Sequence, residues 1–223
     1  RILPAQPRCQ ASADDMNPPS SPISDAWDIP DGVTYLNHGS FGLAPRPVRE
    51  SQQRWTAELQ GQPMEFFVRR LEGLLDETCS VLGRFVGADP RDLVLVDNAT
   101  TGMNIVARSV ELEAGDQVLV TDHEYGAVRR LWQKTCQAAG AELVVRRLPW
   151  PLLEDDSSER LVEHLAASIT DRTRLLVASH VTSATATTLP IESICQAASR
   201  HGVPVCVDGP HAVATLPLDL EQL

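Results

Sequence analysis

The most constraining feature of this sequence is an alternation of short apolar segments with longer amphipathic ones between residues 93 and 207. The segments LVLV, QVLV, LLVA and VPVCV are almost continuously apolar, which is typical of strands buried on both faces. Strands that alternate with helices form a mostly parallel sheet with helices on both faces. The sequence therefore predicts an α/β fold.

The same pattern places the individual elements. We expect a helix whose first turn contains Pro45 and Pro47, because proline is tolerated in a first helical turn. A longer helix carries apolar residues at spacings of three and four and ends at Gly87. We expect strands at 93–96, 118–121, 142–146, 174–178 and 205–207, and helices at about 45–60, 65–86, 101–110, 125–139, 158–168 and 191–200.

Residues 1–30 differ from the rest of the chain, because they are rich in Pro, Ser and Ala and show no periodicity. We expect a flexible leader at 1–30, with Met16 as an alternative start. No apolar run is long enough to cross a bilayer, and the first residues lack the apolar stretch of a secretory signal. We therefore expect a cytoplasmic protein without a membrane partner.

Charge and cysteine content narrow the possible partners. The chain has 19 Lys plus Arg against 30 Asp plus Glu, a net charge of −11, which disfavours binding to a phosphate backbone. Its five cysteines form no CxxC pair and no spacing typical of metal ligands. We expect no nucleic-acid partner, no metal site, and reduced structural thiols.

A polar cluster follows four of the expected strands. Because ligands of open parallel sheets bind outside the carboxyl ends of the strands, these clusters are the candidates for function. They are the stretches 97–102, 121–126, 179–183 and 208–211.

Each cluster alone allows a structural and a functional interpretation. Asn98 and the threonines after it form a helix N-cap, and the same N–H groups could bind an anion. His123 and His180 are typical of hydrogen-bonded histidines at strand ends. Asp208 is more unusual, because a carboxylate at the end of a buried strand needs a cationic partner or hydrogen bonds.

Together, these stretches resemble a known family. The strings are YLNHGSFG, RRLEGLLDET, FVGADPRDLVLVDNATTGMN, TDHEYGAVRR, SHVTSATATTLPIE and GVPVCVDGPHAVATLPLDL. From Thr34 to Leu223 the chain resembles the first part of class V aminotransferase-fold enzymes that use pyridoxal 5'-phosphate (PLP), and within them the isopenicillin N epimerase-like branch. The resemblance implies a fold-type I large domain over 31–223, truncated before its C-terminal part and the small domain.

The resemblance also implies roles for individual residues. Asp208 matches the aspartate that pairs with the protonated pyridine nitrogen of PLP, so that the ring acts as an electron sink. Tyr125 matches the residue that stacks on the ring, with His123 as the alternative. The other implied cofactor contacts are Ala99, Thr100 and Thr101 at the phosphate, and His211 with Thr182 or Ser183 near the phenolic oxygen. Asn37, His38 and Gly39 match the loop on the substrate side.

The chain departs from the family pattern at the lysine that binds the cofactor. That lysine follows the Asp208-type aspartate by roughly two dozen residues in the family, which places it beyond Leu223. The only lysine here is Lys134, expected on a solvent-facing side of a helix. We therefore assign no catalytic residue and expect this fragment to be inactive. Two smaller departures are Pro210, where alanine is usual, and Ser179, where an acid is common.

The implied reaction of the longer protein is abstraction of the α-proton from an external aldimine of an amino acid, as in an epimerase or aminotransferase. A C–S lyase or cysteine desulfurase is the alternative within the same chemistry. The alternative from another class is a non-catalytic binding or interaction module. The resemblance further implies a small-molecule amino-acid substrate and a homodimer.

Overall fold

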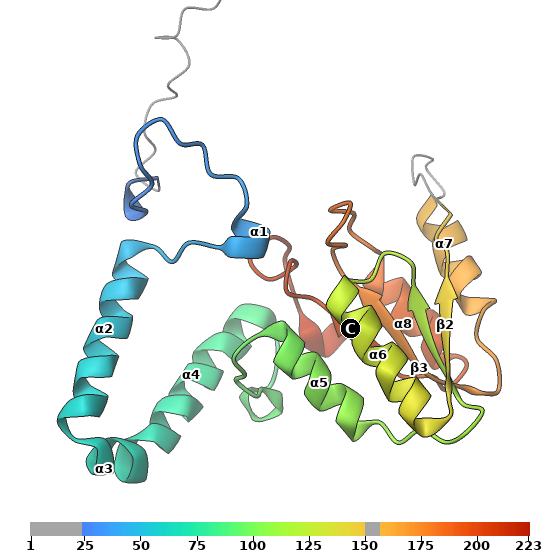
Figure 1. Ribbon diagram of the computed structural model, residues 1–223, viewed down its shortest axis with the longest axis horizontal. Coiled ribbons are helices and arrows are strands. Elements are labelled where there is room, and N and C mark those ends of the chain that lie inside the picture. The colour runs from blue at the N-terminus through green and yellow to red at the C-terminus, as the bar shows by residue number, and fades with distance from the viewer. Residues whose placement is uncertain (1–23, 150–156) are drawn as a thin grey trace, which may run out of the picture. The chain divides into compact units, whose positions relative to one another are not determined.

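The computed structural model describes residues 24–149 and 157–223, so most of the expected leader lies outside the described residues. The chain forms two compact units, Arg1–Leu71 and Glu72–Leu223. The helices are α1 (His38–Phe41), α2 (Arg46–Gly61), α3 (Pro63–Glu65), α4 (Leu71–Val86), α5 (Ala99–Ser109), α6 (Gly126–Ala139), α7 (Ser157–Ala166) and α8 (Ile191–Ser199), and the strands are β1 (Gln117–Thr121), β2 (Glu142–Arg146), β3 (Thr173–Ser179) and β4 (Val205–Asp208) (Figure 1).

In the first unit, the segment 24–30 is attached to the start of α2. The indole N–H of Trp27 donates to the carbonyl of Leu43 at 2.8 Å. Asp28 forms an ion pair with Arg46, also at 2.8 Å. These contacts give the last residues of the expected leader a defined place beside α2.

The helix expected at 65–86 contains a π-helical stretch, Phe66–Arg70, between α3 and α4. Within the first unit, the Arg70 guanidinium lies over the rings of Trp55 and Phe66, at 5.9 and 5.6 Å from their centroids. It also pairs with Glu58 at 2.7 Å. Spacings of three and four predict a helix here but do not distinguish its α-helical from its π-helical turns.

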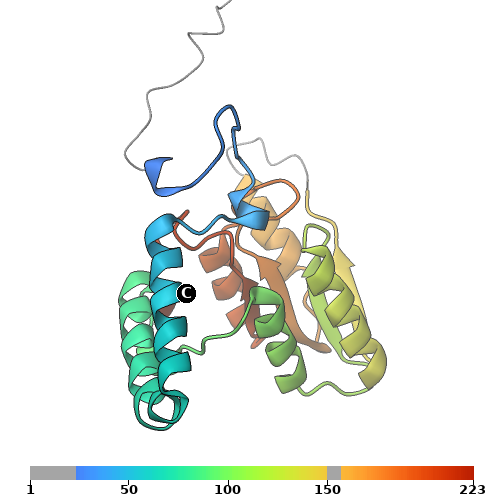
Figure 2. The same cartoon turned by 60° about the vertical axis from the view of Figure 1, so that its left-hand side comes forward.

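The second unit contains the predicted parallel sheet. Its four strands are all parallel, in the order β2-β1-β3-β4. Both views place α5 and α6 on one face and α7 and α8 on the other (Figures 1 and 2). The α/β prediction is confirmed, and these four strands and four helices lie within a few residues of their expected positions.

The side chains of each strand alternate between two apolar clusters, one on each face of the sheet. In β1, Val118 and Val120 pack in the cluster that contains Trp132 of α6, whereas Leu119 packs with Leu165 of α7. In β4, Cys206 belongs to the α5 and α6 face. Asp208, two positions further along the same strand, therefore directs its side chain toward that face.

The strand expected at 93–96 is wrong. The segment is extended, but it pairs with no strand in the part of the chain that the structure describes. Val94 is 79% exposed. A strand forms only where a neighbouring strand supplies hydrogen bonds, so apolar composition alone was insufficient here.

Candidate functional site

Three of the four predicted polar clusters follow strands that end at the same edge of the sheet. Because β1, β3 and β4 are parallel, Thr121, Ser179 and Asp208 lie together at the carboxyl edge. The fourth cluster starts helix α5, which packs against α6 and ends shortly before β1 begins. Topology therefore places the N-terminus of α5 at this edge as well.

Asp208 is the most unusual group at this edge. It is 9% exposed, and no hydrogen bond or ion pair satisfies its carboxylate among residues 24–149 and 157–223. Burial raises the pKa of Asp208, and His211 partly offsets this effect. A buried carboxylate without donors is costly in free energy, which favours a cationic ligand in contact with it.

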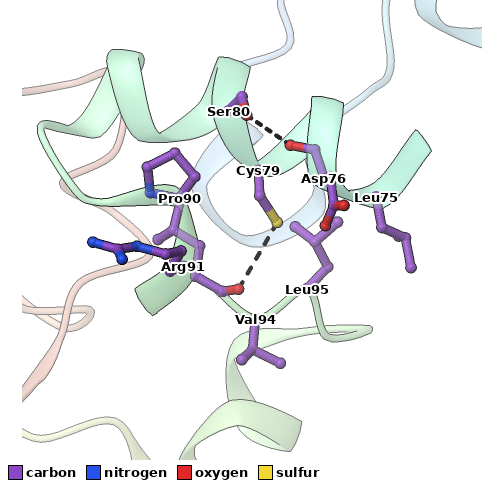
Figure 3. A pocket seen from close by; sticks show the side chains of 9 residues that line it. Leu75, Asp76, Cys79, Ser80, Pro90, Arg91, Val94 and Leu95 are labelled. Atoms are coloured by element: carbon purple, nitrogen blue, oxygen red, sulfur yellow. Dashed lines mark hydrogen bonds between the residues drawn. The ribbon is translucent and has the colours of Figure 1, made fainter. Parts of the chain in front are cut away.

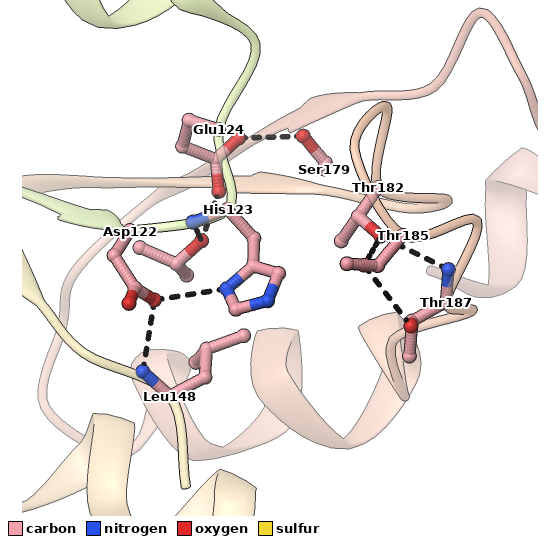
Figure 4. Close-up of polar contacts among 9 residues, drawn as sticks. Asp122, His123, Glu124, Leu148, Ser179, Thr182, Thr185 and Thr187 are labelled. Carbon is pink, nitrogen blue, oxygen red and sulfur yellow. Dashed lines mark hydrogen bonds and ion pairs between the residues drawn. The ribbon is translucent and has the colours of Figure 1, made fainter. Parts of the chain in front are cut away.

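A second buried carboxylate, Glu124, lies in the turn after β1 and is 7% exposed. The Thr121 hydroxyl donates to its Oε1 at 2.7 Å, and the Ser179 hydroxyl donates to its Oε2 at 2.6 Å (Figure 4). Burial raises the pKa of Glu124, against the effect of these hydrogen bonds, and the negative charge of Asp208 raises it further. Both acids therefore belong to one electrostatic cluster.

His123 and Tyr125, the two candidates for stacking, differ in how they are held. The His123 ring is 14% exposed, and its Nδ1 lies 2.9 Å from Oδ1 of Asp122. The same Asp122 oxygen accepts from the backbone N–H of Leu148 at 2.9 Å (Figure 4). Tyr125 is 50% exposed at the N-cap of α6. Of the two rings, His123 has the more fixed orientation.

The predicted cap at the start of α5 is present. The Asn98 side chain accepts from the Thr101 N–H at 2.8 Å, and the Thr101 hydroxyl lies 3.2 Å from the same oxygen. Thr101 thus has both of its donors directed at Asn98. The N–H groups of Ala99 and Thr100 and the Thr100 hydroxyl remain for an anion at the positive end of the helix.

Of the residues predicted near the phenolic oxygen, Thr182 is used within its own turn. Its hydroxyl lies 2.7 Å from that of Thr185 and accepts from the Thr187 N–H at 2.9 Å (Figure 4). Ser183 is exposed, and His211 follows β4 in the same turn as Asp208. The geometry favours Ser183 and His211 over Thr182 as contacts for a ligand.

The three residues predicted on the substrate side belong to the first unit. Asn37 precedes the short helix α1, which contains His38 and Gly39. The His38 ring packs edge-on against Tyr35, with ring centroids 4.9 Å apart, and against Trp27 at 6.0 Å. Aromatic contacts therefore hold this imidazole within its unit.

Lys134 lies on the exposed side of α6, as predicted. The residues of α6 that pack on the sheet are Val128, Trp132 and Cys136, spaced by four. Lys134 falls between them in sequence and therefore on the opposite side of the helix. It is also two turns away from the carboxyl edge, where Asp208 lies.

A pocket of about 580 Å³ lies elsewhere in the second unit, between α4 and the segment 90–95 (Figure 3). It contains Cys79, whose thiol lies 3.8 Å from the carbonyl of Leu93, and Asp76. Neither Glu124 nor Asp208 lines this pocket.

Within the described ranges, no helix could span a membrane, and no group of three or more His, Cys, Asp or Glu side chains could hold a metal ion.

The hydrogen bonds of Glu124 were not predicted from the sequence. Glu124 follows Thr121 by three residues, a spacing in the sequence that allows a side-chain contact across a turn. Its contact with Ser179, which is 55 residues away in sequence, required the alignment of β1 with β3. Ser179, at the position where an acid is common in the family, thus belongs to a hydrogen-bond network with Glu124 and Thr121.

The parallel sheet covered on both faces is the fold of the large domain of fold-type I PLP enzymes. Within this class, the chain belongs to the Aminotransferase class-V family, which matches residues 35–223.

Three similar proteins illustrate the range of the family. The chain is 38% identical over 191 residues to isopenicillin N epimerase from Streptomyces clavuligerus, covering 86% of this chain and 47% of that protein. It is 30% identical over 204 residues to putative L-cysteine desulfhydrase 1 from Oryza sativa subsp. japonica, covering 86% and 42%. A solved mutant of C-DES, with glycine covalently linked to its PLP cofactor, has a TM-score of 0.78 at 27% identity, covering 86% and 51%. The chain spans about half the length of these relatives.

Proposed function

We propose that this chain forms the cofactor-binding part of a PLP-dependent enzyme that acts on amino acids. The proposal rests on the buried carboxylate of Asp208, which has no hydrogen-bond or ion-pair partner among the described residues. A protonated pyridine nitrogen would supply both the positive charge and the hydrogen bond that this group lacks. The phosphate would bind at the N-terminus of α5, on the same edge of the sheet.

The residues at the edge fit the other parts of the cofactor. Ala99 and Thr100 offer donors for the phosphate, and the His123 ring, oriented by Asp122, would stack on the heterocycle. When bound, the cofactor supplies the electron sink for a carbanion at the α-carbon of the substrate. The protein's own contribution here is to orient the ring and to keep its nitrogen protonated.

Equilibrium dialysis with PLP and with pyridoxal, which lacks the phosphate, tests this proposal directly. We expect saturable binding of PLP and much weaker binding of pyridoxal, because the α5 terminus contributes only to the phosphate. Equal affinity for the two compounds would contradict the assignment of the phosphate site. Absence of PLP binding would contradict the proposed function itself.

The Thr100 hydroxyl is expected to contribute to the phosphate site. Replacing Thr100 by alanine should weaken PLP binding by about 10- to 100-fold, because a hydrogen bond to a charged group contributes about 1.5–3 kcal/mol. The same dialysis with pyridoxal should give an unchanged affinity. An equal loss for both compounds would indicate a disturbed helix start instead. Ser109→Ala, at the exposed far end of the same helix, is the control.

Lys134 is not expected to bind the cofactor covalently. After incubation with PLP and reduction with borohydride, peptide mapping by mass spectrometry should show no adduct on Lys134, because that side chain lies away from the carboxyl edge. Lys134→Arg should keep the PLP affinity within about twofold, as is usual for surface substitutions. An adduct on Lys134 that disappears in the variant would contradict this expectation.

For the reaction of the whole protein, we propose abstraction of the α-proton, as in an epimerase or aminotransferase. The similarity to isopenicillin N epimerase supports it. The similarity to an L-cysteine desulfhydrase and to C-DES favours carbon–sulfur cleavage as the second candidate. Exchange of the α-proton in D₂O without release of sulfide from L-cysteine would support the first, and release of sulfide would support the second.

A further inference from the structure

Two buried carboxylates lie at the carboxyl edge of the sheet, and His211 only partly offsets the effect of burial on Asp208. In the described part of the chain, no Arg or Lys forms an ion pair with Glu124 or Asp208. One cationic group bound against Asp208 would satisfy that residue. Glu124 would remain a second acid, which the pairing of Asp208 with the cofactor does not explain.

The geometry fixes Glu124 close to Asp208. Ser179, whose hydroxyl donates to Glu124 Oε2, is the register partner of Asp208 across β3 and β4. The Thr121 hydroxyl donates to the other carboxylate oxygen. Because both oxygens accept hydrogen bonds, the two hydroxyls favour the ionised form of Glu124 against the larger opposing effect of burial, and they hold its side chain in place.

The negative charges of both acids also affect the pKa of a neighbouring thiol, that of Cys206. Cys206 lies two positions before Asp208, and its side chain faces α5, where its sulfur is 3.7 Å from that of Met103. Burial together with the negative charges of Asp208 and Glu124 raises the pKa of Cys206 to about 11. The two carboxylates therefore act on the same region of the α5 and α6 face.

We propose that Glu124 is a positioning residue that supplies a second negative charge behind Asp208, so that a nitrogen heterocycle bound against Asp208 keeps its proton. The inference rests on the proposed function and deepens it, because it assigns the protonation of the ring to two acids. Glu124 acts through the electrostatic potential and through Ser179, without touching the ring.

A matched pair of variants separates charge from packing. Glu124→Gln keeps the size of the side chain and can still bond both hydroxyls, because these can donate or accept, but it removes the charge. Glu124→Asp keeps the charge and shortens the side chain. The other titratable groups at this edge are His180, His211, Cys206, Tyr125 and the Asp122 and His123 pair, and they are the same in both variants.

The readout is the protonation of the cofactor ring. PLP labelled with ¹⁵N in the ring is bound to each protein, and its ¹⁵N chemical shift is followed against pH. We expect Glu124→Gln to lower the pH at which the nitrogen loses its proton by about one unit or more, as removal of a nearby opposite charge does. Glu124→Asp should stay closer to the unchanged protein.

Binding of 1-deaza-PLP, in which a C–H group replaces the ring nitrogen, provides a second readout. Glu124→Gln should weaken the binding of PLP but not that of the deaza compound. If the glutamine variant titrates like the unchanged protein, or if both variants shift alike, the inference is overturned while the proposed function stands. If the unchanged protein binds no PLP, both are overturned.

Discussion

Asp208→Asn is expected to weaken PLP binding by at least about 30-fold and, at the same time, to raise the melting temperature of the cofactor-free protein. The loss of affinity follows from the charge, because truncating one partner of a buried charged pair costs about 2–5 kcal/mol. Asparagine can still accept a hydrogen bond, but it cannot neutralise a pyridinium. Fluorescence titration with PLP measures this part of the prediction.

The gain in stability follows from the same burial. Without a ligand, the Asp208 carboxylate has no donor among the described residues, but its oxygens keep some contact with solvent, so leaving it unpaired costs about 1 kcal/mol, the lower end of the usual range. Asparagine is neutral and avoids most of this cost. For a chain of this size, each kcal/mol corresponds to about 2–4 °C in Tm, so we expect a rise of a few degrees at pH 7.

The pH dependence of this gain has a definite sign. Burial raises the pKa of Asp208 in the folded protein. A raised carboxyl pKa contributes stability that is fully present below the unfolded-state pKa, near about 4, and is lost as pH rises through the folded-state pKa. The advantage of Asp208→Asn should therefore be largest at neutral pH and should disappear toward about pH 4.

The control for Asp208→Asn is Asp171→Asn, at an exposed position before β3 and at the opposite edge of the sheet. It should change neither the PLP affinity nor the melting temperature beyond the usual range for surface substitutions. A melting temperature of Asp208→Asn below that of the unchanged protein would mean that the carboxylate has a stabilising partner in solution. A PLP affinity equal to that of the unchanged protein would remove the basis of the proposed function.

The sheet was predictable because its strands carry their information locally. The strands β1 and β3 contain the uninterrupted apolar runs VLV and LLVA, and each is followed by a helix with one apolar stripe. The segment 93–96 has the same composition and is not a strand. Whether an apolar segment is a strand depends on a partner that supplies hydrogen bonds, and composition does not reveal that partner.

At the carboxyl edge, Asp208 and the cap at Asn98 were predictable because each is defined by its own strand or helix. The sequence also marked Thr101 and Thr182 as ligand contacts, yet both direct their hydroxyls to neighbouring residues in the same turn. Competition between a ligand and local hydrogen bonds depends on geometry. Glu124 was overlooked for the opposite reason, because its partner Ser179 comes from a distant strand.

Trp132→Ala is expected to lower the free energy of unfolding by about 3–5 kcal/mol, the range for removing a large aromatic side chain from a core. Trp132 is 0% exposed in the cluster that joins α5 and α6 to the sheet. Alanine would leave a cavity that rigid strands on one side and two helices on the other can fill only in part. Urea unfolding monitored by circular dichroism measures the loss.

Trp132→Phe separates packing from hydrogen bonding at the same position. The indole N–H of Trp132 is buried and has no partner among the described residues, so removing it relieves an unpaired donor. Phenylalanine keeps most of the ring volume, and its loss should be well below that of alanine. Trp55→Ala, at a position that is 42% exposed, is the control and should also lose less unfolding free energy than Trp132→Ala.

Equal losses of unfolding free energy for Trp132→Phe and Trp132→Ala would mean that the indole N–H has a partner in solution. An unchanged unfolding free energy for Trp132→Ala would contradict the placement of this ring in the core. The stability of the α5 and α6 face matters for function, because that face also holds α5, whose N-terminus is proposed to bind the phosphate.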